Sequence, residues 1–210
     1  MEAEILRRGL RTIDEIFKRC KQSQELDLFR IPDIINSLDK KQIKSKQWLV
    51  DTLAEYYSSN GTIVIGGGWY GLLGYLLKLK FPDHKIINTD IDENAIDIGC
   101  VIFPEIKHKI IDMINENYSE TWARENDKGV FISTSVEHIH RDEVDSIMFY
   151  NPNKMVVLQS NNYFDHVSHI NCSETLEDFK EYISPMLKEI CYAGELHLGD
   201  YTRFMIIGKT

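Results

Sequence analysis

The feature that most constrains the fold is a run of β-branched residues that stops at a cluster of glycines. Residues 63–65 read Ile-Val-Ile, glycines follow at 66–68 and again at Gly71, and a leucine-rich stretch then occupies residues 72–79. The apolar run predicts a buried strand, and the leucines predict a helix. Glycines between them allow a tight turn and let a ligand approach the backbone closely. The segment therefore predicts a strand, a glycine turn and a helix whose N-terminus points at a ligand.

Acidic residues end the two strands that are expected next. A second apolar stretch, residues 85–88, leads to Asp90, and a third, residues 107–111, leads to Asp112. An acid that follows the glycines by roughly 20 residues is placed to accept both hydroxyl groups of a ribose, as in dinucleotide-binding folds. Between these strands, Asp92 can cap a helix. This repetition predicts a sheet that binds NAD, FAD or S-adenosylmethionine (SAM).

These motifs resemble those of class I SAM-dependent methyltransferases, and the resemblance covers residues 60–210. It implies that Gly66, Gly68 and Gly71 hold the methionine part of SAM. It also implies that Asp90 binds the ribose and that Asp112 contacts the adenine. Methyltransferase-like proteins of phage and bacterial genomes are similar in this respect.

Two features depart from the usual pattern of that family. Val64 stands where the family often has an acid, and the glycine spacing is nearer to a dinucleotide fingerprint. The end of the chain nevertheless favours SAM over NAD, because residues 194–208 predict two strands about a turn at Gly199 and Asp200. The resemblance implies such an antiparallel hairpin as the end of a methyltransferase sheet.

The predicted architecture is α/β: a Rossmann-like three-layer sandwich whose seven-stranded, mostly parallel sheet ends in an antiparallel hairpin. Apolar residues at helical spacing before the first strand predict an N-terminal helical extension, residues 1–60. The SAM-binding domain is then residues 61–210. The N-terminal helices either cover the cofactor and shape an acceptor pocket, as the resemblance implies, or only cap the sheet.

Later elements follow the same logic. Residues 113–123 are expected to form an irregular or helical crossover, and strands are expected at residues 129–135 and 155–160. A serine followed by early acids predicts a helix capped by Ser173.

Candidate catalytic residues follow the fourth strand, where ligands gather in α/β sheets. Glu137 and His138 would stand beside the reactive methyl group, and this pair could remove a proton from an incoming nucleophile. Alternatively, Glu137 is a first-turn acid of a helix and His138 a surface residue. Asn161, Asn162 and Tyr163 follow the fifth strand and are predicted to orient the acceptor, although Asn-Asn is also an ordinary turn signal.

Four histidines invite a metal interpretation because imidazole is a common ligand. His138 and His140 follow the fourth strand, and His166 and His169 follow the fifth. Their spacing fits no strong zinc pattern, and no cysteine or acid in the sequence pattern completes it. We therefore expect no metal site and a structural or surface role for these histidines.

The composition narrows the setting and the partners. The four cysteines form no Cys-x-x-Cys pair and the N-terminus lacks the plan of a signal peptide, so a cytoplasmic location is expected. A net charge of −9 favours a small-molecule or protein acceptor over nucleic acid, and no apolar run suggests a membrane partner. A local basic cluster is expected to be a solvated helix face; it comprises Lys40, Lys41, Lys44 and Lys46.

Three alternatives to methyl transfer stay open. The stretch 89–95 also resembles nicotianamine synthase-like proteins, which transfer the aminocarboxypropyl group of SAM. A NAD-dependent oxidoreductase is a second alternative, and a non-catalytic SAM-binding subunit is a third.

Overall fold

The computed structural model describes residues 1–20, 30–115 and 128–210, and it contains one mixed sheet of seven strands. The strand order is β3-β2-β1-β4-β5-β7-β6. The first five strands in this order, from β3 to β5, pair in parallel with their neighbours. Strand β7 runs antiparallel to both β5 and β6. The strands are β1 (Ile63–Gly66), β2 (Ile86–Asp90), β3 (Lys107–Ile110), β4 (Val130–Ser133), β5 (Met155–Asn161), β6 (Glu189–His197) and β7 (Thr202–Lys209).

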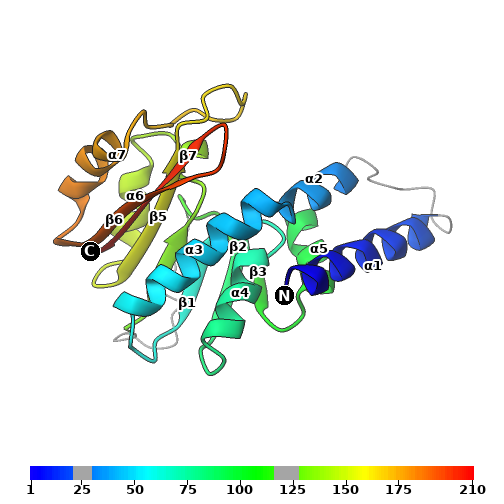
Figure 1. Ribbon diagram of the computed structural model, residues 1–210. Coiled ribbons are helices and arrows are strands. Elements are labelled where there is room, and N and C mark those ends of the chain that lie inside the picture. The colour runs from blue at the N-terminus through cyan, green and yellow to red at the C-terminus, as the bar shows by residue number, and fades with distance from the viewer. Residues whose placement is uncertain (21–29, 116–127) are drawn as a thin grey trace.

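Helices cover both faces of this sheet. Figure 1 shows α1 lying beside α5, with α7 on the opposite side of the molecule. The α-helices are α1 (Glu2–Cys20), α2 (Arg30–Ser37), α3 (Lys40–Tyr56), α4 (Leu72–Lys80), α5 (Glu93–Ile102), α6 (Val144–Tyr150) and α7 (Leu176–Ile183). Short 3₁₀ turns are η2 (Val136–His138) and η3 (Ser184–Met186). The α/β layering and the terminal hairpin confirm the predicted fold class.

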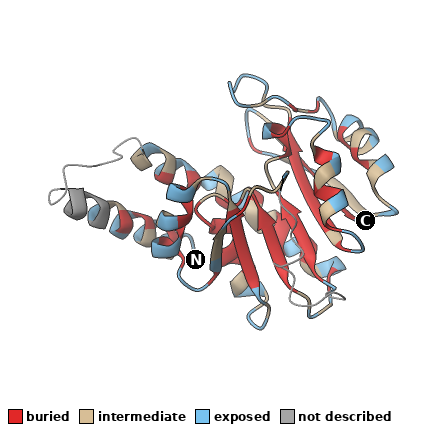
Figure 2. Ribbon diagram, turned by 180° about the vertical axis from the view of Figure 1, so that it is seen from behind, coloured by how far each residue is buried: buried red, intermediate tan, exposed pale blue. Residues whose placement is uncertain are grey.

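The central strands send alternate side chains to opposite faces, as a two-sided sheet requires. Ile63 and Ile65 of β1 join the core formed with α3, α4 and α5, whereas Val64 joins the core formed with α6 and α7. Figure 2 shows these strands buried between the helices. The N-terminal helices add Ile5 and Ile34 to the first core, so they share apolar packing with the sheet.

Side-chain caps fix where helices begin. Asp39 accepts a hydrogen bond from the backbone N–H of Gln42 and starts α3, and Asp92 starts α5 as predicted. The predicted cap of α7 at Ser173 is wrong. Thr175 caps this helix instead, because Asp178 at the third helical position completes a capping box with it.

The predicted crossover lies only partly within the described chain. Residues 113–115 follow β3 as a turn, and the rest of the segment, residues 116–123, lies outside the described residues. Within the described ranges, no helix is both long and apolar enough to cross a membrane.

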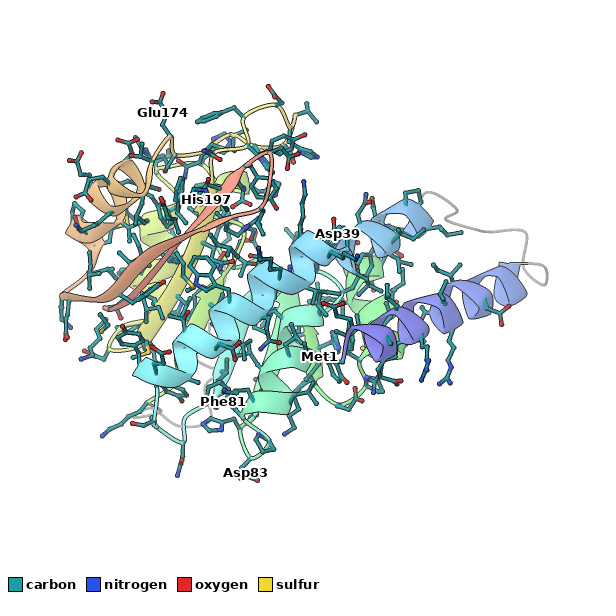
Figure 3. The ribbon with its side chains drawn as sticks, viewed as in Figure 1. Met1, Asp39, Phe81, Asp83, Glu174 and His197 are labelled. Atoms are coloured by element: carbon teal, nitrogen blue, oxygen red, sulfur yellow. The ribbon has the colours of Figure 1, made fainter. Side chains whose placement is uncertain are left out.

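The two ends of the strands are far apart in the molecule. Figure 3 labels Phe81 and Asp83, which precede β2, at the end opposite Glu174, which follows β5. Parallel strands thus present their carboxyl ends together at the Glu174 end, where α/β sheets bind ligands.

Candidate functional site

The glycine loop between β1 and α4 is the first part of the site. Three of its residues have positive φ: Gly67 (63°), Trp69 (51°) and Gly71 (94°). Gly68 N–H donates to the carbonyl oxygen of Thr89 at 2.9 Å, which ties the loop to β2. The loop therefore turns back across the carboxyl ends of β1 and β2, as the sequence predicts.

Asp90 ends β2 and holds this loop. Its Oδ2 accepts the backbone N–H of Trp69 at 2.7 Å, and its Oδ1 accepts the N–H of Asp92 at 3.1 Å. The side chain is half-buried. A carboxylate offers about four acceptor positions, so each oxygen retains capacity for a further donor such as a ribose hydroxyl. The residue therefore fits the ribose role expected from the sequence.

Gly68 faces the protein. A Cβ atom there would lie 2.0 Å from Oδ1 of Asn88, a fully buried side chain that donates to the Trp69 carbonyl oxygen at 3.0 Å. A side chain at Gly68 would therefore disturb the fold itself as well as the approach of a ligand. The loop and β2 are packed too closely for any side chain at this position.

Gly66 and Gly71 are also held by close packing. A Cβ atom at Gly66 would lie 2.6 Å from the Phe131 ring, and one at Gly71 would lie 2.7 Å from the His108 ring. The three glycines predicted to hold SAM are therefore first required by the strand-to-helix turn itself.

Asp112 follows β3 in a tight turn. Its carboxylate accepts the backbone N–H of Ile114 at 2.9 Å and the side-chain amide of Asn115 at 2.8 Å. Burial opposes ionisation, but these hydrogen bonds outweigh it and lower the pKa of Asp112. The residue lies at the strand end where the adenine role was predicted, and that role stays a prediction.

The N-terminal helices are anchored next to this half of the site. Arg30 at the start of α2 donates to both oxygens of Asp92, with Nη2 to Oδ1 at 3.0 Å. Burial opposes ionisation of Asp92, but hydrogen bonds from Arg30 and from the Ala95 N–H outweigh it and lower its pKa. This ion pair fixes α2 against the first turn of α5.

The second half of the site is built on Glu137, which is only 1% exposed. Its Oε1 accepts the Asn161 amide at 2.7 Å and Nη2 of Arg203 at 3.1 Å. Nη1 of Arg203 donates in turn to the Thr134 carbonyl oxygen at 2.8 Å. Elements β5, β7 and η2 are thereby joined through one buried carboxylate.

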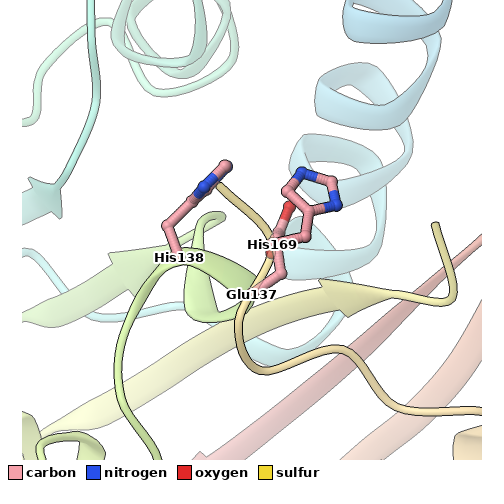
Figure 4. Close-up of side chains that lie close together, drawn as sticks. All are labelled: Glu137, His138 and His169. Atoms are coloured by element: carbon pink, nitrogen blue, oxygen red, sulfur yellow. The ribbon is translucent and has the colours of Figure 1, made fainter. Parts of the chain in front are cut away.

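Histidines surround this carboxylate. His138 is exposed and His169 is half-buried, and one ligand atom from each lies within 4.8 Å of a Glu137 carboxylate oxygen and of the other. Figure 4 shows Glu137 and His138 rising from one segment, with His169 reaching the same place from another. His166 packs beside His169, with ring centroids 4.8 Å apart. The expectation that no acid completes the histidine pattern is wrong, because the fold brings Glu137 to it.

The loop after β5 is held against η2. The backbone N–H groups of Ile170 and Asn171 donate to the Glu137 carbonyl oxygen at 2.9 and 3.1 Å. These hydrogen bonds bring the loop that carries His166 and His169 next to Glu137. The same loop also contacts His138, whose Nδ1 lies 3.0 Å from the carbonyl oxygen of Ser168.

The predicted acceptor residues are placed differently from one another. Asn161 is buried against Glu137, and Asn162 accepts the backbone N–H of Thr202 at 2.7 Å. Both amides therefore make contacts that hold the strand ends together. The Tyr163 ring lies 5.8 Å from the His169 ring and 5.7 Å from the Tyr201 ring.

Two charged residues of the site were missed from the sequence. Arg203 is a buried cation within β7. Lys46 of α3 lies within electrostatic reach of Arg203 and Glu137, and burial, reinforced by the Arg203 charge, lowers its pKa to about 7. Lys46 is thus not on the solvated face predicted for the basic cluster. The sequence did contain a signal of this burial: Lys46 is spaced three and four residues from Ile43 and Val50, which places it on the buried face of the helix.

Comparison with known proteins rests on structure. No protein-family model matches the chain, and no curated protein matches its sequence. Magnesium protoporphyrin IX methyltransferase from Synechocystis, solved with bound SAH, is similar with a TM-score of 0.63 and 9% identity, covering 94% of each chain.

Two further solved structures give the same result. N-methyltransferase NodS from Bradyrhizobium japonicum has a TM-score of 0.61 at 12% identity, covering 82% of this chain and 98% of its own. A TehB-like SAM-dependent methyltransferase from Corynebacterium glutamicum has a TM-score of 0.54 at 15% identity, covering 79% and 87%. The chain therefore has the fold of class I SAM-dependent methyltransferases, as predicted.

Proposed function

We propose that the protein binds SAM and transfers its methyl group to an oxygen or nitrogen atom of a small-molecule or protein acceptor. The observation that carries the proposal is Asp90, which ends β2 beside the glycine loop with acceptor capacity to spare. The fold supports the same conclusion, since similar structures include methyltransferases solved with bound SAM or SAH.

In this proposal one half of the site binds SAM and the other half binds the acceptor. The loop of Gly66, Gly68 and Gly71 lies against the methionine part of SAM, with Asp90 on the ribose and Asp112 by the adenine. SAM supplies an electrophilic methyl group. The acceptor binds on the Glu137 side, where Tyr163 and the histidines offer aromatic surface and polar edges.

The chemistry is an in-line displacement. A lone pair of the acceptor forms the bond to the methyl carbon as the carbon–sulfur bond breaks, and the electrons of that bond pass to sulfur. The acceptor proton passes to a base, and we assign proton removal to the Glu137 and His138 pair at the end of β4. Orientation of the two reactants supplies much of the remaining acceleration.

The experiment that tests this proposal compares SAM binding by wild type and Asp90→Asn. A hydrogen bond to a charged group contributes about 1.5–3 kcal/mol, so calorimetry should show an affinity for SAM about tenfold or more lower in the variant. Asp97→Asn is the matched control, because Asp97 is exposed on α5 and should leave affinity unchanged.

The outcomes separate the alternatives. Wild-type SAM affinity in a folded Asp90→Asn protein would refute the ribose assignment. Binding of NADH in place of SAM would favour the oxidoreductase. Incubation with cell extract then identifies the transferred group, because methyl transfer yields S-adenosylhomocysteine and aminocarboxypropyl transfer yields methylthioadenosine.

A further inference from the structure

We infer that Glu137, His138 and His169 form a binding site for a divalent transition-metal ion beyond the carboxyl ends of β4 and β5, on the proposed acceptor side. Their ligand atoms lie within 4.8 Å of one another. Two imidazoles and one carboxylate are a ligand set that proteins use for such ions.

The carboxylate provides the first argument. Glu137 is 1% exposed, and among the residues that the structure describes its Oε2 has no hydrogen-bond partner. Its other oxygen is held by Asn161 and Arg203. Burying a neutral polar group without a hydrogen-bond partner costs about 1–3 kcal/mol, and burying a charged one costs more. A cation in contact with Oε2 would remove this cost.

The histidines provide the second argument. Nδ1 of His169 lies 2.6 Å from the Tyr163 carbonyl oxygen, and Nδ1 of His138 lies 3.0 Å from the Ser168 carbonyl oxygen. A carbonyl oxygen only accepts, so in each ring Nδ1 carries the proton and Nε2 presents a lone pair. Metal-binding histidines are oriented in this way by a backbone carbonyl. In both rings, the carbonyl contacts thus leave Nε2 as the nitrogen available to a metal ion.

The surroundings select the kind of ion. Two of the three ligands are imidazoles, which disfavours Mg²⁺ and Ca²⁺ because these ions are bound mainly by oxygen ligands. Nitrogen ligands favour Zn²⁺ and its first-row neighbours. Ligands around a tetrahedral ion lie about 3.4 Å apart for bonds of about 2.1 Å, so the three groups, now within 4.8 Å of one another, would draw together on binding. His138 is exposed, which leaves the site open to an incoming acceptor.

The part played by the ion in methyl transfer rests on the proposed function. An acceptor hydroxyl bound to the ion would lose its proton at lower pH, and the resulting oxyanion would attack the methyl carbon. Glu137 and His138 would then act as ligands, and the proton would pass to solvent or to a neighbouring side chain. The substrate class indicated is an acceptor with an oxygen nucleophile.

The test measures metal binding directly, without SAM. Chelator-treated protein is titrated with ZnCl₂ and MnCl₂ by calorimetry, and one ion per chain is expected. His138→Gln and His169→Gln should each lower the affinity by at least about tenfold, the minimum seen when even outer partners of metal ligands are lost. His140→Gln is the control: His140 is exposed, two residues from His138, and outside the cluster.

The result that would overturn the inference is unchanged Zn²⁺ and Mn²⁺ affinity in both His138→Gln and His169→Gln. Equal loss in His140→Gln, or tighter binding of MgCl₂ than of either transition ion, would overturn it as well. Circular dichroism checks that each variant is folded. SAM titration of the same samples is separate, so a protein that binds metal but not SAM refutes the proposed function and leaves the metal site standing.

Discussion

Arg203→Met should destabilise the protein strongly. The Arg203 and Glu137 side chains are 9% and 2% exposed, and Nη2 lies 3.1 Å from Oε1. Removing one member of a buried ion pair leaves the other charge without compensation and costs about 3–5 kcal/mol. The variant also loses the hydrogen bond to Thr134 at 2.8 Å. For a chain of this length, the melting temperature should fall by about 6–20 °C.

The assay is urea unfolding in the presence of a chelator, so that no bound ion contributes. The midpoint should fall while the slope of free energy against urea stays constant. Glu137→Gln and the double variant Glu137→Gln/Arg203→Met complete a double-mutant cycle. The double variant leaves no uncompensated charge. Its loss in free energy of unfolding should therefore be smaller, by about 1–3 kcal/mol, than the sum of the losses of the two single variants.

Two results would refute this reasoning. A loss below about 1 kcal/mol in Arg203→Met would mean that the pair is worth no more than an exposed ion pair. Strict additivity in the cycle would mean that the two side chains do not stabilise each other, whatever their distance.

Two further predictions concern the glycine loop and α3. Gly68→Ala should lower the free energy of unfolding by about 1–3 kcal/mol, because its Cβ would overlap the buried Asn88 amide; an unchanged urea midpoint would contradict this. Lys46→Met should stabilise the protein at pH 7 by about 2–4 kcal/mol. Burial lowers the pKa of Lys46 to about 7, so the charged ammonium is less favourable in the folded state than in the unfolded state, and the substitution removes this penalty. The folded pKa lies below the unfolded one, so this gain should be full below about pH 7 and shrink as pH rises to 10; melting curves at pH 6, 8 and 10 that show a constant gain would exclude the assignment.

Local patterns predicted the backbone elements of the proposed cofactor half. Strand, glycine turn and helix are contiguous in the chain, and Asp90 follows one unit later, so periodicity and turn chemistry suffice to find them. The same patterns could not show that Gly68 faces Asn88, because that contact depends on the spacing between two strands. A glycine needed for packing and a glycine needed for a ligand have the same signature in a sequence.

The acceptor half was predicted only in part. Glu137 and His138 were found because they directly follow a strand, but the Arg203 partner is 66 residues away and His169 comes from a different loop. Tertiary packing brings these groups together, and no spacing rule encodes it. A charged residue inside an apolar strand, as Arg203 is, was the available signal, since such a charge is seldom buried unless paired.

The position of β7 leads us to expect that the two halves of the sheet differ in local stability. This strand lies between β5 and β6 and carries Arg203 into the Glu137 network, whereas the glycine loop depends on β1 and β2. Local opening of the β6–β7 hairpin would disconnect the buried carboxylate while the other half remained folded. Hydrogen exchange would then report two cooperative units within one sheet, with the acceptor side opening at lower free energy than the cofactor side.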